Sequence, residues 1–366
     1  MKDLQLPGGD LLCRDDRAIV IKLAGARKIL STSYLNGGYR EDLRCLFNFC
    51  EVYGSENERC EMRAPTNEEH LRLVAGELGL PAEATSGLST AAKMKYATIR
   101  SECYDDFSVT ALVTAGIDVN GSRAGDPALW HEKEGIPVLE KPGTINIILF
   151  IDAHLSAGAL TRVLVTCTEA KTAALQEVLA PSCYSNGLAT GSGTDGTIIV
   201  SNADAPTCLT NAGQHSKLGE YTGRVVKMAV KEALVAESGF RDYARGSVLK
   251  RMKRFGLNEA RLLEAYQSAG LPNQIDPAAF SEGLKELDGN DSLVARASIY
   301  AHILDLLQWQ LIDPADAIEI AERVLANVAE ILEIKPPRFE LKTGENGPVS
   351  EELISCLARL MAAGIG

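Results

Sequence analysis

The stretch that decides the fold is residues 189–200, which read ATGSGTDGTIIV. Its glycines follow the order Gly191-x-Gly193-x-x-Gly196, a spacing that also occurs in loops that bind the pyrophosphate of dinucleotides. In those loops, however, the glycines follow a strand and open a helix. Here an apolar, β-branched run at residues 197–200 follows the glycines and favours a strand. The pattern therefore argues against a dinucleotide fold and predicts a hydroxyl-rich loop that leads into a strand.

Short strands are predicted on both sides of this loop. Apolar and β-branched runs indicate strand pairs at residues 18–21 with 28–32, 96–102 with 108–114, and 144–151 with 161–166. Helices are expected at residues 66–78, 168–179 and 217–237, the first opened by a capping box of Thr66 and Glu69. Strands and helices of this kind predict an α+β domain with a mixed or antiparallel sheet.

The character of the sequence changes near residue 238. Beyond it the strand signal fades, and helical periods indicate helices at residues 251–269, 277–287, 293–311, 314–334 and 350–363. We therefore expect two domains. Residues 1–237 form the α+β domain, in which helices pack on the sheet, and residues 238–366 form an all-α C-terminal region.

The overall composition restricts the class of protein. The formal net charge is −12, which argues against strong electrostatic binding to nucleic acid or to an anionic membrane. The nine cysteines contain no C-x-x-C pair, so a zinc ribbon or redox dithiol has no support. The first ten residues are polar, and no uninterrupted apolar run is long enough to span a bilayer. We expect a cytoplasmic protein with reduced thiols and no membrane insertion.

Five polar clusters lie at the ends of predicted strands, where loops commonly carry binding or catalytic groups. The first two are suited to bind amides or anions through Asn36, Arg40, Asn120, Arg123 and Asp126. Their Gly and Asp-Pro steps are equally typical of ordinary turns. The third places Asn146 inside an apolar strand, where its amide needs a partner from a ligand or from a neighbouring loop.

The other two clusters and one histidine offer acid–base chemistry. Residues 168–171, TEAK, are expected to open a helix, whose free N–H groups would stabilise an oxyanion. Glu169 would be an acid or base there and Lys171 would polarise a carbonyl, although an acidic first turn also simply favours the helix dipole. The glycine loop gathers hydroxyls around Asp195, which suits a Thr or Ser nucleophile or an Asp that holds a water, although a plain surface turn is equally compatible. His215, at the start of the last predicted helix of the first domain, is a candidate because histidine is the commonest acid–base group, although a lone surface histidine is also commonplace.

No sequence motif indicates a metal. The chain has no H-E-x-x-H and no close pair of histidines. Asp195, Glu169 and His215 leave open a divalent metal site, and no cofactor is established by the sequence.

Seven stretches, in order, resemble the adenosylcobinamide amidohydrolase family. They are STSYLNGGYRED (31–42), TAGIDVNGSRAGDP (114–127), PGTINI (142–147), LSAGAL (155–160), TEAKTAA (168–174), ATGSGTDGTIIV (189–200) and HSKLGEYTG (215–223). The resemblance implies hydrolysis of the amide that joins a propionyl arm of the corrin ring to aminopropanol. The products would be adenosylcobyric acid and 1-aminopropan-2-ol, in cobinamide salvage for cobalamin biosynthesis. It says nothing about residues after 238.

Combining the resemblance with the residues gives a hypothesis for the site. Asp195 and His215 would activate water or the Thr194 hydroxyl, the helix start at residues 168–171 would hold the oxyanion, and Glu169 would protonate the amine. The expected catalytic residues are Asp195, His215, Glu169, Lys171 and Thr194. The expected substrate-binding residues are Asn36, Arg40, Asn120, Arg123, Asp126, Asn146, Thr190 and Glu220.

Two other functions are compatible with the same residues. One is a corrinoid-binding protein without catalysis, and the other is an amidohydrolase with a different amide substrate. In each case the expected partner is a small corrinoid or amide rather than a nucleic acid. The helical region is suited to form a homo-oligomer, to cover the substrate or to dock a partner.

Overall fold

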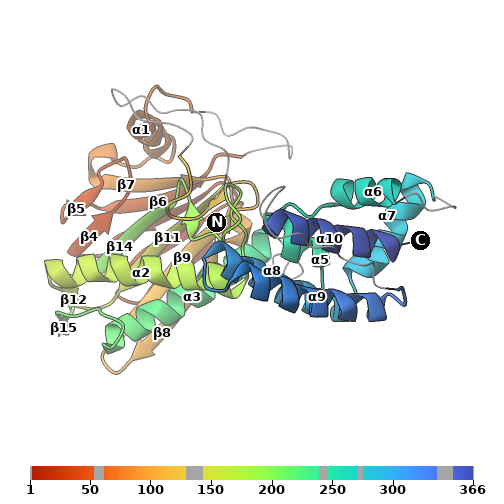
Figure 1. Cartoon of the computed structure of the whole chain (residues 1–366). Helices are drawn as coiled ribbons and strands as arrows, with labels where there is room; N and C mark the ends of the chain where they lie inside the picture. The colour runs from red at the N-terminus through yellow and green to blue at the C-terminus, as the bar shows by residue number, and fades with distance from the viewer. Residues whose placement is uncertain are drawn as a thin grey trace. The chain divides into compact units, whose positions relative to one another are not determined.

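The computed structural model describes residues 2–52, 62–128, 143–238, 246–269, 275–335 and 349–365. The chain divides into two compact units, Met1–Phe240 and Arg241–Gly366. The first unit contains the sheets, and the described part of the second unit is helical (Figure 1). The α+β class with a helical C-terminal region is therefore confirmed.

Six strands form the larger sheet of the first unit. In spatial order they are β5 (Gly38–Arg40), β4 (Arg27–Ser31), β14 (Gly196–Asn202), β11 (Thr144–Ile151), β9 (Phe107–Gly116) and β8 (Thr98–Tyr104). Strands β11 and β14 run parallel, and every other neighbouring pair is antiparallel. A parallel pair needs a crossover connection, which helix α2 (Ala157–Glu177) provides. The starts of β11 and β14 therefore meet at the same end of the sheet.

A second sheet packs face to face on the first. Its strands, in spatial order, are β1 (Lys2–Gln5), β2 (Leu11–Arg14), β3 (Ala18–Lys22), β6 (Cys45–Cys50) and β7 (Thr85–Thr90). Ile21 and Leu46 of this sheet share one core with Ile148 of the larger sheet. Side chains alternate across each strand, so each sheet also has an outer face that a helix can cover.

Helices cover both outer faces, which gives four layers (Figure 1). Helix α1 (Asn67–Glu77) packs Leu71 and Val74 against Phe47 and Phe49 of the smaller sheet. Helix α3 (Lys217–Ser238) lies beside α2 and packs on β8 and β9 of the larger sheet. The capping box that predicts α1 is present, since the Thr66 Oγ1 accepts a hydrogen bond from the Glu69 N–H.

The predicted strand at residues 161–166 is wrong. These residues belong to α2, which begins eleven residues before the expected helix start at Thr168. The Ser156 Oγ caps the helix by accepting from the Ala159 N–H at 3.2 Å. Residues buried at helical spacing include Leu160, Val163 and Cys167. The β-branched composition of this segment favours a strand. The Ser156 cap and the burial of residues at helical spacing favour a helix instead, and they outweigh that preference.

The second unit contains six described α-helices. They are α5 (Val248–Met252), α6 (Glu259–Ser268), α7 (Pro277–Asp288), α8 (Asp291–Gln308), α9 (Pro314–Ile331) and α10 (Val349–Ala363). The single helix predicted for residues 251–269 is instead broken, because Gly256 adopts a left-handed conformation with φ +80°. A left-handed residue of this kind ends a helix. The ion pair between Arg254 and Asp305 is largely buried in this unit.

The close packing of Gly87 in β7 against Phe47 in β6 can be tested by substitution. A Cβ added to Gly87 would overlap the ring of Phe47 directly opposite. We expect Gly87→Ala to lower the free energy of unfolding by about 1–3 kcal/mol through overpacking. Gly223→Ala in α3, where the space is open, should raise it by about 0.5–1 kcal/mol. Chemical denaturation followed by circular dichroism measures both, and a neutral Gly87→Ala would contradict the packing argument.

Candidate active site

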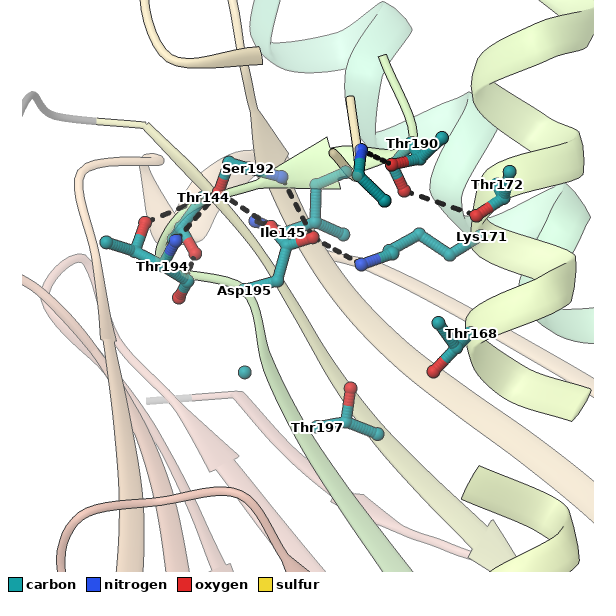
Figure 2. A network of polar contacts seen from close by, with 12 residues as sticks. Thr144, Ile145, Thr168, Lys171, Thr172, Thr190, Ser192, Thr194, Asp195 and Thr197 are labelled. Atoms are coloured by element: carbon teal, nitrogen blue, oxygen red, sulfur yellow. Dashed lines mark hydrogen bonds and ion pairs between the residues drawn. The ribbon is translucent and has the colours of Figure 1, made fainter. Parts of the chain in front are cut away.

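A polar network lies where β11 and β14 begin (Figure 2). The loop before β14, the first residues of β11 and one side of α2 contribute to it. These segments are distant in sequence, and the four-layer fold brings them together. The network contains Lys171, Thr194 and Asp195 of the expected catalytic residues, together with Thr190 of the expected binding residues.

Asp195 is the centre of this network. Its Oδ1 accepts from the Ile145 N–H at 2.9 Å and from the Ser192 Oγ at 2.7 Å. Its Oδ2 accepts from the Ser192 N–H at 3.0 Å and from the Lys171 Nζ. The side chains of Lys171 and Asp195 are only 12% and 11% exposed. The carboxylate is therefore held in one orientation beside a cation that water screens only partly.

Gly191 makes the ion pair sterically possible. A Cβ at this position would overlap the Asp195 Oδ2 and would lie 2.7 Å from the Lys171 Nζ. By contrast, a Cβ added to Gly193 would meet no atom within 4 Å. The two glycines of the loop therefore differ. Gly191 allows a close approach between charged groups, whereas Gly193 borders open space.

Hydroxyl groups anchor the loop around the ion pair. The Thr194 Oγ1 donates to the Gly143 carbonyl at 2.8 Å, and the Thr144 Oγ1 donates to the Thr194 carbonyl at 2.7 Å. The Thr190 Oγ1 accepts from the Ala124 N–H at 2.8 Å. Ser192 was not among the expected site residues, although its hydroxyl contacts the carboxylate directly. Its place in a Gly- and hydroxyl-rich loop is the signal that was available in the sequence.

The helix start expected at residues 168–171 does not exist, and this overturns its role as an oxyanion hole. Thr168 lies in the middle of α2, where backbone N–H groups are used within the helix. Lys171 still faces the network, as Figure 2 shows, and Thr168 lies on α2 beside it. The positive charge that α2 contributes to the site therefore comes from the Lys171 side chain and not from a helix terminus.

Glu169 and His215 lie outside the hydrogen bonds of the network. Glu169 is exposed and accepts from the Gln214 Nε2 at 2.7 Å, and His215 is exposed just before α3. Two helical residues two positions apart point to different sides, so Glu169 and Lys171 diverge. Among the described residues, no hydrogen bond links Glu169 or His215 to Asp195. Their catalytic roles stay predictions.

Two of the expected binding residues, Asn36 and Arg40, hold the loop after β4. The Asn36 Nδ2 donates to the carbonyls of Ala82 and Thr85, both at 2.7 Å. Arg40 forms a two-pronged ion pair with Asp42, at 2.6 and 2.7 Å. The hydrogen bonds from Arg40 lower the pKa of Asp42 to about 2. In this structure both side chains are therefore engaged within the protein.

A second group holds residues 117–128, which follow β9. The Asn120 Nδ2 donates to the Gly143 carbonyl at 2.9 Å, and the Arg123 Nη1 donates to the Leu188 carbonyl at 3.4 Å. Burial alone would raise the pKa of Asp126. Hydrogen bonds from Ser182, Ser185 and the Arg123 N–H outweigh burial and lower that pKa. Asn120 and Thr194 share the Gly143 carbonyl, which connects this loop to the network.

Asn146 is buried between the two sheets and contacts Gly196, the residue that follows Asp195. Its Nδ2 donates to the Asn48 Oδ1 at 2.9 Å and to the Ser89 carbonyl at 2.8 Å. Its Oδ1 accepts from the Gly196 N–H at 3.1 Å. A Cβ at Gly196 would lie 2.8 Å from this oxygen. The amide is thus hydrogen-bonded on both sides by neighbouring segments, which is one of the two roles that its position allowed.

Two further groups have shifted pKa values, and Glu220 lies away from the network. Lys217 and Tyr221 beside it contact Tyr104, at the end of β8 that pairs with the start of β9. Glu220, an expected binding residue at the start of α3, pairs with Lys217 at 2.8 Å, and this hydrogen bond lowers the pKa of the Glu220 carboxyl. Cys167 is fully buried in α2, one turn before Lys171. Burial raises the pKa of its thiol to about 12, so the thiolate is not formed near neutral pH.

Metal ligands and membrane spans can be assessed for the described part of the chain. It contains no group of three or more His, Cys, Asp or Glu side chains arranged to hold a metal ion. Within the same ranges, no helix combines the length and the apolar character needed to cross a bilayer.

Comparison with known proteins identifies the family. The model of adenosylcobinamide amidohydrolase (CbiZ) matches residues 5–242, which include every segment of the network. This chain belongs to the adenosylcobinamide amidohydrolase family. An uncharacterised protein, MJ1613 of Methanocaldococcus jannaschii, is 32% identical over 62% of this chain and 89% of its own length. The adenosylcobinamide amidohydrolase of Methanosarcina mazei is 34% identical over 44% of this chain and 66% of its own length.

Solved structures give weaker likenesses. The PH0078 protein from Pyrococcus horikoshii OT3 matches 70% of this chain and 90% of its own, with a TM-score of 0.34 and 13% identity. A β-aminopeptidase from Burkholderia sp. matches 70% of this chain and 88% of its own, with a TM-score of 0.29 and 17% identity. Both scores are low, and nothing about the reaction follows from them.

The contacts of Asn146 predict a large effect on stability. Asn146→Ala would leave the Gly196 N–H, the Ser89 carbonyl and the Asn48 Oδ1 without a buried partner, at about 1–3 kcal/mol for each group left unsatisfied. We expect the free energy of unfolding to fall by at least about 2 kcal/mol in chemical denaturation. Asn327→Ala, on the exposed side of α9, should change it by less than about 0.5 kcal/mol. Equal stability of the two variants would contradict the structural role of Asn146.

Proposed function

We propose that this protein hydrolyses the amide of adenosylcobinamide to give adenosylcobyric acid and 1-aminopropan-2-ol, in cobinamide salvage for cobalamin biosynthesis. The observation that carries the proposal is the ion pair of Lys171 and Asp195, largely buried inside the region that matches the family. The Methanosarcina mazei relative bears the name of this activity. The proposal places the protein in the cytoplasm, with a corrinoid as its partner.

Amide hydrolysis requires an activated nucleophile, stabilisation of the oxyanion and a proton for the departing amine. Asp195 would accept the proton of the nucleophile, because its carboxylate is fixed next to a hydroxyl. The Lys171 ammonium would stabilise negative charge that develops on the carbonyl oxygen. Its effect is strong because the pair is only slightly exposed to solvent.

The departing amine also needs a proton, and Asp195 can return the proton that it took from the nucleophile. Glu169 and His215 are the further proposed candidates, since both are exposed, Glu169 on α2 and His215 just before α3, where they can exchange protons with water. Amide side chains of the corrin would bind along the loops that carry Asn36, Asn120 and Arg123, with local rearrangement of the hydrogen bonds described above. The second unit would serve as a contact between copies of this chain.

Substitution of the ion pair tests the proposed function. We expect Asp195→Asn and Lys171→Met to lower kcat for adenosylcobinamide at least about 100-fold, the scale of a lost acid–base or electrostatic group. Released 1-aminopropan-2-ol is measured by mass spectrometry. Lys227→Met, which removes an exposed pair between α3 and Glu177, should keep full activity.

Three results would argue against the proposal. Nearly full activity in Asp195→Asn and Lys171→Met would remove the ion pair from the mechanism. Tight binding of adenosylcobinamide by the unaltered protein without amine release would favour a corrinoid-binding protein. Cleavage of another amide in preference to adenosylcobinamide would favour a different substrate.

A further inference from the structure

We propose that Ser192 is the nucleophile of this reaction and that hydrolysis proceeds through an ester between its Oγ and the corrin carboxyl. This inference rests on the proposed function and adds the identity of the attacking group to it. It replaces the earlier expectation that water or Thr194 attacks the amide. Three features of the network support it.

The first feature is the hydrogen bond between nucleophile and base. The Ser192 Oγ donates to the Asp195 Oδ1 at 2.7 Å, and the other oxygen of Asp195 is fixed by Lys171. A hydroxyl, a base and a third group that orients the base form the usual arrangement of an activated nucleophile. Ser192 is also partly exposed, at the end of the two-residue strand β13 (Gly191–Ser192), so a substrate can reach it.

The second feature is that the competing groups are not activated. The Thr194 and Thr144 hydroxyls donate to backbone carbonyls, which cannot take up a proton. The Cys167 thiol is fully buried. Within the network as the structure describes it, the hydroxyl of Ser192 is the one that donates to a carboxylate.

The third feature is a donor for the oxyanion. Gly193 directly follows Ser192 and is exposed, and the space beside its Cα is open. The N–H that follows a nucleophile commonly binds the oxyanion in hydrolases with an exposed serine. The Lys171 ammonium has three N–H donors, and its contact with the Asp195 Oδ2 uses one of them.

The proposed reaction has two balanced stages. The Ser192 Oγ bonds to the amide carbon while its proton passes to Asp195, and the carbonyl oxygen becomes negative beside the Gly193 N–H and Lys171. The C–N bond then breaks, and the amine leaves with the proton that Asp195 held. Next, water attacks the ester and gives a proton to Asp195. Release of adenosylcobyric acid returns this proton to the Ser192 oxygen, so the net consumption is one water.

Hydroxylamine tests for the ester in the unaltered protein. If a common ester forms, hydroxylamine and water compete for it after the amine has left. Adenosylcobinamide and an analogue with an ethanolamine arm should then give the same ratio of corrinoid hydroxamate to corrinoid acid. A ratio that changes with the departing amine, or the absence of hydroxamate, would overturn the proposal, because the attack would then precede loss of the amine.

Substitutions identify the residue that carries the ester. Ser192→Ala should reduce kcat roughly 1000-fold or more and abolish hydroxamate formation. Ser192→Thr keeps a hydroxyl and should recover part of this loss, whereas Thr194→Val should cost much less than Ser192→Ala. Ser355→Ala, in the second unit, is the matched control and should keep full activity. Circular dichroism and thermal unfolding check that each variant folds.

The outcomes separate the two proposals. Amine release by the unaltered protein with a Ser192→Ala rate within about tenfold of it would overturn the role of Ser192 and leave the proposed function intact. A larger loss in Thr194→Val than in Ser192→Ala would assign the nucleophile to Thr194. No amine release by the unaltered protein would overturn both proposals. If Ser192→Ala fails to fold, the hydroxylamine ratio in the unaltered protein still decides whether an ester forms.

Discussion

The carboxylate of Asp195 joins three segments that are far apart in the sequence. It accepts the Ile145 N–H at the start of β11, both donors of Ser192 in the glycine loop, and the Lys171 ammonium from α2. A charged group with little solvent exposure is stable only when its hydrogen bonds are made inside the protein. The arrangement of strand, loop and helix at this end of the sheet therefore depends on one side chain. The contacts of Asp195 that would serve catalysis are the same contacts that hold these segments together.

Several motif residues contribute to the site by holding loops. Asn36, Asn120 and Asn146 use their amides to bind carbonyls of neighbouring segments. Loops cannot be buried unless their backbone groups find partners, and an amide side chain supplies a donor and an acceptor at once. Polar residues in family motifs can thus be essential for holding loops in place without touching the substrate.

Much of the fold could be predicted from the sequence, because its signals were local. The strand after Gly196, the cap at Thr66 and the long helix from Lys217 all depend on neighbouring residues. The start of α2 could not be predicted, because Thr161, Val163 and Val165 favour a strand when burial is unknown. In the site, Lys171 and Asp195 were expected, but their contact was not. A Thr or Ser nucleophile was expected in the glycine loop, but Thr194 was named rather than Ser192, because only three-dimensional proximity to a carboxylate distinguishes one loop hydroxyl from another.

Helix α2 has two roles, because it connects the parallel strands β11 and β14 and also carries Lys171. As the crossover, it must return the chain along the length of a strand. From its cap at Ser156 the helix rises about 1.5 Å per residue, so Lys171 stands roughly 20 Å further along, close to the length of a seven-residue strand. One inserted residue before Lys171 would turn the ammonium by about 100° and point it away from Asp195. The number of helical residues before Lys171 therefore fixes where its ammonium lies. Relatives can change that number only by close to whole turns.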